Sequence, residues 1–327
     1  MTIRRRRLLQ LVVSLATLPA SLGLAAAQTY PSRPITVVVP YTAGSPTDLV
    51  ARVILDKMGP PLGQAIVVEN VGGAGGSIGA GRVARADADG YTLCIGNNGS
   101  HVLSGALYTL NFDVLKDFEP ISRLTTNSQI IITNNSIPAQ SLKELVAWLK
   151  SDRKISAGVA GPMAVVSTLD FQNKASAAPL QLVPYRGTVG PIQDLIAGHI
   201  DLMVDQVSSA TPFVKAGSVR AYAVAAKTRS PSLPDVPTVD EAGLPGLYGS
   251  IWTGLWAPKG TPADIVAKLV AVTKEALADQ TVRKKLADIG FEIVPNDEQT
   301  PEALRAYQKE EVDKWWPLAK AANLKGN

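Results

Sequence analysis

The sequence is poor in the residues that most often carry chemistry or crosslinks, with one cysteine, two histidines and 6% aromatic residues among 327. A single cysteine, Cys94, excludes an internal disulfide, so the stability of the fold has to come from its hydrophobic core. With 46% apolar residues and few aromatics, we expect an aliphatic core in which Cys94 is a small buried side chain. Two distant histidines and no close cluster of acids provide no recognisable set of metal ligands.

The sequence also has no net excess of positive charge once its N-terminal segment is removed. Residues 4–7 are all arginine, residues 8–24 are uncharged and mostly apolar, and Ala25-Ala26-Ala27 offers an A-x-A cleavage pattern. We therefore predict a signal peptide over residues 1–27 and a periplasmic protein that starts at Gln28. The chain has 32 Lys and Arg against 28 Asp and Glu, so losing four arginines leaves 28 against 28. This balance argues against nucleic acid as a partner.

Short β-like runs alternate with helical patterns, which favours an α/β fold with mostly parallel sheets. The 300 residues left after cleavage exceed the usual size of one core and favour two domains. The predicted strands are 35–39, 65–68, 91–95, 130–132, 155–157, 180–183, 202–204 and 221–225. The predicted helices are 47–58, 78–85, 142–150, 165–174, 191–197 and 211–215, followed by consecutive helices over 262–322.

The segment 40–48 is the most informative part of the chain. It joins the apolar run 35–39 to a helical pattern, with Ser45 at the N-cap position and Pro46 at the first helical position. Asp48 follows Ser45 by three residues, which predicts a capping box. A helix that starts beside a loop of small residues presents backbone N–H groups and the positive end of its dipole, so the segment suits an anion. An ordinary strand–turn–helix corner is the alternative.

The glycine-rich segment 72–79 gives only weak support to a nucleotide-binding motif or a hydrolase motif. The segment departs from G-x-G-x-x-G at Ile78 and lacks the Gly-Lys-Ser/Thr of a phosphate-binding loop, so no nucleotide cofactor is expected. It does match the G-x-S-x-G pattern of hydrolases at Ser77. Such a serine needs a histidine base, and both His101 and His199 suit structural or surface roles better. We therefore predict a protein that is not an enzyme and has no cofactor.

An ordered set of short segments covers residues 30–325. These segments are YPSRPI (30–35), VVEN (67–70), GGSIG (75–79), DGYTL (89–93), DFEPI (117–121), VPYRG (183–187), LPDVPT (233–238), EAGLPG (241–246) and APKGTP (257–262). As a set they resemble the Bug family, the periplasmic solute-binding proteins of tripartite tricarboxylate transporters. The resemblance implies a two-lobed periplasmic binding protein fold, with residues 28–128 and 252–327 in one lobe and 129–251 in the other. It also implies a monomer that binds a small organic acid and delivers it to integral-membrane transporter subunits.

The resemblance further implies that ligand carboxylates are held by loop amides, hydroxyls and waters rather than by an arginine clamp. The ligand-binding residues carried over on this basis are Thr42, Ala43, Gly44, Ser45, Thr47, Asp48, Asn97, Asn98 and Ser100 and, across the cleft, Tyr185, Thr188 and Asp205.

The chain departs from the usual family pattern at two places. It has Ala43-Gly44-Ser45-Pro46 where relatives usually carry a proline and several glycines, which predicts a stiffer loop. It has Met163, Ala164, Val165 and Val166 where relatives are usually polar. We expect these four residues to form an apolar wall of the ligand site, suited to an aromatic or other apolar-bodied carboxylate; the alternative is that they only begin a buried helix. A receptor of the same fold used for sensing is the alternative function.

Overall fold

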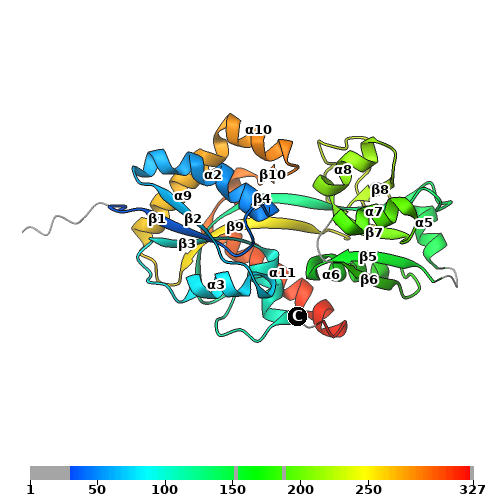
Figure 1. Ribbon diagram of the computed structural model, residues 1–327, viewed down its shortest axis with the longest axis horizontal. Coiled ribbons are helices and arrows are strands. Elements are labelled where there is room, and N and C mark those ends of the chain that lie inside the picture. The colour runs from blue at the N-terminus through cyan, green and yellow to red at the C-terminus, as the bar shows by residue number, and fades with distance from the viewer. Residues whose placement is uncertain (1–29, 151–153, 186–188, 325–327) are drawn as a thin grey trace, which may run out of the picture.

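The computed structural model describes residues 30–150, 154–185 and 189–324, so the predicted signal peptide and Thr188 lie outside the described residues. Strands and helices alternate in an α/β fold, as predicted (Figure 1). The elements are β1 (Ile35–Val39), α2 (Pro46–Leu62), β2 (Ile66–Asn70), η1 (Ala74–Gly76), α3 (Ser77–Ala84), β3 (Thr92–Asn97), η2 (Gly99–Leu103), α4 (Ser104–Leu107), β4 (Phe118–Thr133), α5 (Leu142–Leu149), β5 (Ser156–Ala160), α6 (Pro162–Lys174), β6 (Gln181–Tyr185), α7 (Val189–Ala197), β7 (Leu202–Gln206), α8 (Val207–Lys215), β8 (Arg220–Val224), β9 (Ser250–Pro258), α9 (Ala263–Ala278), α10 (Gln280–Asp288), β10 (Glu292–Ile293), η3 (Asn296–Glu298) and α11 (Pro301–Ala321).

The strands form one curled sheet in the order β2-β1-β3-β9-β4-β7-β5-β6, with β10 and β8 also paired to β4. Strand β1 pairs in parallel with β2 and β3, and β5 pairs in parallel with β6 and β7. Among the described residues, every antiparallel pairing involves β4 or β9. We call β1–β3, β9, β10 and the start of β4 the first sheet half, and β5–β8 and the end of β4 the second sheet half.

Strands β4 and β9 run between the two sheet halves (Figure 1). Residues from Phe118 to Ser128 of β4 pair with β9, whereas Gln129 to Thr133 pair with β7 and, in part, β8. The sequence predicted only residues 130–132 of β4 and missed β9, because polar side chains interrupt the apolar run. One of these polar residues, Arg123 of β4, is buried, and its guanidinium lies 3.7 Å from the ring centre of Tyr307. The predicted division into lobes at 128/129 and 251/252 stays a prediction.

Helices cover both faces of the sheet and enclose four clusters of buried side chains. In the first sheet half, α2, α9 and α10 pack on one face, and α3, η2 and α11 pack on the other. In the second sheet half, α5 covers one face, and α7 and α8 cover the opposite face. No described helix combines the length and apolar character needed to cross a bilayer.

The expectation of an aliphatic core is wrong for the cluster under α11. Trp252, Trp256 and Trp315 are all fully buried there, together with Cys94. The indole of Trp252 donates a hydrogen bond of 2.9 Å to Glu311, so this cluster also buries polar partners. Composition alone does not show that the few aromatic residues gather in one place.

Helix α6 belongs to both halves of the molecule. Met163 and Val166 in its first turns are part of the cluster under α11, whereas Phe171 is part of the cluster under α5. The helix therefore joins the two cores, and its N-terminus is fixed against the first sheet half.

The close approach of α3 to β1 generates a stability prediction. A Cβ atom added at Gly79 would lie 2.5 Å from the Val71 carbonyl oxygen and 2.8 Å from Pro40 Cα, so backbone would have to move. Gly79→Ala should therefore lower the free energy of unfolding by about 1–3 kcal/mol, as overpacking does. The neighbouring Ile78 is 55% exposed, and Ile78→Ala should cost about 0.5 kcal/mol or less. Urea denaturation of both variants checks this, and equal losses would contradict it.

Candidate functional site

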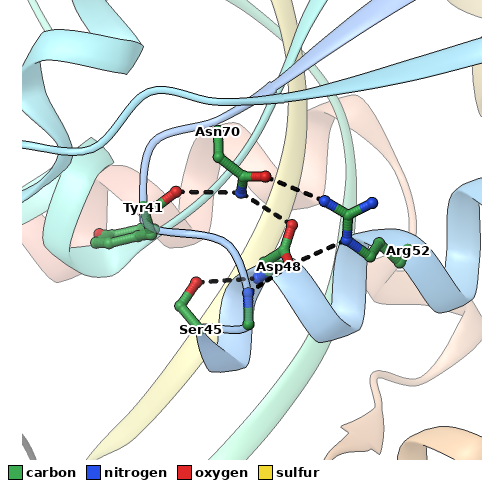
Figure 2. A network of polar contacts seen from close by, with 6 residues as sticks. Tyr41, Ser45, Asp48, Arg52 and Asn70 are labelled. Atoms are coloured by element: carbon green, nitrogen blue, oxygen red, sulfur yellow. Dashed lines mark hydrogen bonds and ion pairs between the residues drawn. The ribbon is translucent and has the colours of Figure 1, made fainter.

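The loop before α2 is held by a network of polar contacts centred on Asp48 (Figure 2). The Ser45 hydroxyl accepts a hydrogen bond of 3.3 Å from the Asp48 amide, so Ser45 is the N-cap, as predicted. The Asp48 carboxylate accepts hydrogen bonds from the Gly44 amide at 2.8 Å and from Arg52 Nε at 3.0 Å. The return bond of the predicted capping box thus goes to Gly44, one residue earlier than in the standard motif.

Asn70 at the end of β2 ties the same loop to the neighbouring strand. Its Nδ2 donates to Asp48 Oδ1 at 2.9 Å and to the Tyr41 carbonyl at 3.1 Å, and its Oδ1 accepts from Arg52 at 3.0 Å (Figure 2). Sequence reasoning missed Arg52 and Asn70. The spacing of four residues between Asp48 and Arg52 on a helix could have indicated the ion pair. Asn70 has no local signal, because only the pairing of β1 with β2 brings it to the loop.

Asp48 is ionised in this network. Its residue is 1% exposed, and burial by itself would raise the pKa. The hydrogen bonds from Arg52, Asn70 and Gly44 outweigh burial and hold the pKa of Asp48 below its ordinary value. A buried, ionised and fully bonded carboxylate shapes the loop and is unsuited to direct contact with an anion.

The predicted residues of this loop fall into two groups. Thr42, Ala43 and Gly44 are exposed at the loop tip, whereas Thr47 and Asp48 are buried; the N-cap residue Ser45, between them, is half-buried. The Thr47 hydroxyl accepts a hydrogen bond of 3.0 Å from Asn97 Nδ2. Tip residues can therefore meet a ligand through their backbone, and the buried pair fixes the loop.

The loop after β3 lies against the start of α2. Asn97 Oδ1 accepts hydrogen bonds from the Gly99 amide at 2.8 Å and from the Tyr41 hydroxyl. The Ser100 hydroxyl contacts the Asn97 amide at 3.1 Å and His101 Nδ1 at 2.9 Å. The structure therefore brings the predicted residues Asn97 and Ser100 to loop 41–48, although their side chains are engaged within the protein.

A cavity of about 210 Å³ lies between the loop after β3 and the start of α6. Of the predicted site residues, Asn97, Asn98 and Met163 line this cavity, and no charged side chain lines it. A larger groove of about 840 Å³ lies near the far end of α2, around Gly59 and Gly63, away from the loop tip. The smaller cavity is lined by Tyr41, Gly75, Asn97, Asn98, Gly99, Leu107 and Tyr108 on one side, and by Ala160, Gly161, Pro162, Met163 and Ile251 on the other.

The start of α6 contributes backbone as well as apolar side chains. Gly161 is the N-cap with φ +83°, and no side chain caps the helix. Of the four predicted wall residues, Met163 lines the cavity, Val166 is fully buried in the core, and Ala164 and Val165 are half-buried. One residue of the expected apolar wall therefore lies at the cavity, and the role of all four in binding stays a prediction.

The predicted residues of the second sheet half do not line this cavity. The Tyr185 hydroxyl donates a hydrogen bond of 2.6 Å to Asp194, which raises the pKa of Tyr185 to about 12. Asp205 accepts hydrogen bonds from Ser209 at 2.7 Å and from the Gln206 amide at 2.8 Å, and burial raises its pKa. Thr188 lies outside the described residues. Ligand contacts by these three residues stay a prediction.

The side-chain hydrogen bonds of the two histidines within the described residues go to Ser100 and Asp194 rather than to Ser77. The His101 ring is fully buried and stacks on Trp256 with ring centres 3.8 Å apart, and burial lowers its pKa to about 3. His199 lies beside Asp194 in the second sheet half. The described part of the chain also contains no group of three potential metal-ligating side chains.

The Asp48 network generates a prediction about pH. A carboxylate whose pKa is lowered by folding stabilises the protein above its unfolded pKa of about 3.9, and this contribution is lost as the pH falls further. Asp48→Asn should therefore lower the free energy of unfolding at pH 7 by about 1–2 kcal/mol, with a difference from the parent that shrinks below about pH 4. Denaturation between pH 3 and 7 measures it. Asp56→Asn, exposed on the same helix, is the control, and a pH-independent loss in Asp48→Asn would contradict the account.

Solved structures with the same fold are periplasmic binding proteins. The chain is 38% identical to the periplasmic binding protein BugD, with a TM-score of 0.74 over 91% of this chain and 100% of that one. It is 39% identical to MatC from Rhodopseudomonas palustris with bound malate, with a TM-score of 0.74 over 88% and 99%. It is 31% identical to Rpa4515 of R. palustris with adipate, with a TM-score of 0.75 over 90% and 99%.

The sequence match extends over most of the chain. Residues 50–324 match the model of the tripartite tricarboxylate transporter family receptor. Proteins of this family are periplasmic and bind substrates rather than catalysing reactions, which confirms the predictions that the chain resembles the Bug family and is not an enzyme. The chain belongs to the tripartite tricarboxylate transporter receptor family of periplasmic solute-binding proteins.

Proposed function

We propose that this protein captures a small organic carboxylate in the periplasm and delivers it to the membrane subunits of a tripartite tricarboxylate-type transporter. The observation that carries the proposal is the cavity of about 210 Å³ between the loop after β3 and the uncapped start of α6. Pockets for drug-sized ligands usually measure roughly 300–1,000 Å³, so this cavity suits a smaller molecule.

Backbone groups account for recognition of the carboxylate. No lysine, arginine or histidine lines the cavity, so an arginine clamp is not available there. Helix α6 starts at the cavity without a side-chain cap, and helix α2 starts at the exposed loop tip formed by Thr42, Ala43 and Gly44. The positive end of a helix dipole stabilises an anion in both places, and the uncapped N–H groups add to this at α6, whereas at α2 the Gly44 amide is already bonded to Asp48.

Two relatives support this class of ligand. MatC of R. palustris has bound malate, and Rpa4515 has adipate. Both molecules are small dicarboxylates, and both proteins share the fold of this chain over nearly nine-tenths of its length.

The apolar part of the cavity favours a ligand with an apolar body. Leu107, Met163 and Ile251 line it beside the polar groups of Asn97 and Asn98. Burying apolar surface contributes roughly 25 cal/mol per Å². The hydroxyl and third carboxylate of citrate would cost several kcal/mol if they were buried without partners. An aromatic or alkyl carboxylate therefore fits the site better than citrate.

Titration calorimetry tests this preference. Terephthalate and benzoate should bind more tightly than citrate, because their rings cover the apolar wall. Met163→Gln should weaken terephthalate binding by about 10-fold, close to the loss of a buried apolar side chain. Ile196→Gln, exposed on α7 outside the cavity, is the matched control and should leave the affinity unchanged. Tightest binding of citrate would reject the apolar-bodied ligand, and an absence of binding by every carboxylate would reject the function.

Export with cleavage after Ala27 is part of the same proposal. The basic residues 4–7 and the A-x-A site at 25–27 motivate it. Protein recovered from the periplasm should have the intact mass of a chain that starts at Gln28. Recovery of the full-length chain in the membrane fraction alone would contradict this prediction.

A further inference from the structure

The cavity has to supply hydrogen-bond donors to an anion without the help of a cationic side chain. The two oxygens of a carboxylate accept about four hydrogen bonds, and an anion that is buried without them is costly. No lysine, arginine or histidine lines the cavity, and the polar side chains that do line it are those of Tyr41, Asn97, Asn98 and Tyr108. A side-chain donor for the carboxylate therefore has to come from this set.

Three of these four side chains already donate hydrogen bonds to other groups of the protein. The Tyr41 hydroxyl donates to Asn97 Oδ1. Asn97 Nδ2 donates to the Thr47 hydroxyl at 3.0 Å, and Asn98 Nδ2 donates to the Ser250 carbonyl at 2.9 Å. These bonds hold the loop after β3 against α2 and β9, so a ligand that took over their donors would weaken the walls of its own site.

The Tyr108 hydroxyl differs from the other three groups. Within residues 30–150, 154–185 and 189–324, it makes no hydrogen bond to the protein. It is also absent from the buried side-chain atoms that lack a partner, and Tyr108 is half-buried, so the hydroxyl is accessible rather than sealed inside the core. An accessible phenol that lines a cavity and has no partner in the described protein is available to a ligand.

The position of the ring is fixed by its neighbours. Tyr108 directly follows α4, and its side chain packs against the cluster under α11. A Cβ atom added at Gly75 would lie 3.0 Å from Cε2 of Tyr108 and 3.3 Å from its hydroxyl oxygen. Gly75 lines the same cavity and has a φ of +65°. The hydroxyl end of the ring therefore lies beside a glycine of the cavity wall, where a side chain would crowd it.

We propose that the Tyr108 hydroxyl donates a hydrogen bond to a carboxylate of the bound ligand. The inference rests on the proposed function and adds one side chain to the backbone groups that recognise the anion there. A hydrogen bond from a neutral hydroxyl to a carboxylate is charge-assisted and is stronger than one between neutral groups. The ring of Tyr108 lies next to Leu107 in the cavity lining, so the same residue also offers apolar surface to the body of the acid.

The variant Tyr108→Phe removes the hydroxyl and keeps the ring. Calorimetry with terephthalate, benzoate and adipate should show binding that is weaker than in the parent by about 10-fold or more, the usual effect of losing a hydrogen bond to a charged group. Tyr91→Phe is the matched control, because the Tyr91 hydroxyl accepts a hydrogen bond from the Ser32 amide at 2.8 Å and neither residue lines the cavity. It should keep the parent affinity.

The outcomes separate this inference from the proposed function. If the parent binds these acids and Tyr108→Phe weakens each of them by less than about threefold, the inference is overturned and the carboxylate function stands. If the parent binds none of the three acids, the proposed function is contradicted, and this inference with it.

Two further comparisons distinguish direct contact from a structural role. Because the hydroxyl has no hydrogen bond within the described protein, Tyr108→Phe should leave the midpoint of urea unfolding at the parent value. A clear fall in that midpoint would mean that the hydroxyl acts through the fold, and would overturn the direct contact. The loss of affinity should also be similar for benzoate and adipate, since both present a carboxylate. A loss confined to the aromatic acids would assign the hydroxyl to the ligand body and would likewise contradict the inference.

Discussion

The buried carboxylate of Asp48 is the interaction on which the site depends. Three donors, from Gly44, Arg52 and Asn70, converge on it and join the loop tip, the first turns of α2 and the end of β2. Because the charge of Asp48 is satisfied inside the protein, the loop can hold backbone groups at the surface without collapsing. In the proposed function, Asp48 shapes the anion-binding loop without contacting the anion.

The second constraint is that the two sheet halves are joined at several places. Strands β4 and β9 cross between them, and α6 shares side chains with the cores of both. The cavity is therefore bounded by loops of the first half and by the start of a helix whose body lies in the second. Its lining has no charged side chain, so in the proposed function helix dipoles and amide groups stabilise the carboxylate in place of an ion pair.

The sequence was informative wherever the signal was local. Strand β1, the start of α2 and the cap formed by Ser45 follow from apolar runs, Pro46 and the spacing to Asp48, and the structure agrees with all of them. The alternation of strands and helices also gave the right fold class. These features are set by residues close together in the sequence, so a single sequence is enough to predict them.

Contacts between distant segments were beyond local reasoning. Strand β9 was missed, and Asn70 reaches the loop only through the pairing of β1 with β2. Val166 is buried under α11, a helix that begins 135 residues later in the chain, and its part in a ligand wall stays a prediction. The family resemblance selected Asn98, whereas only the folded protein shows that Tyr108 lines the same cavity.

A crystal structure with the tightest-binding carboxylate tests the central claim most directly. The account predicts that a ligand carboxylate lies about 3 Å from backbone N–H groups at residues 42–43 or at residues 163–164, with no lysine or arginine in contact. A carboxylate paired with a cationic side chain, or bound in the groove near the far end of α2, would contradict it.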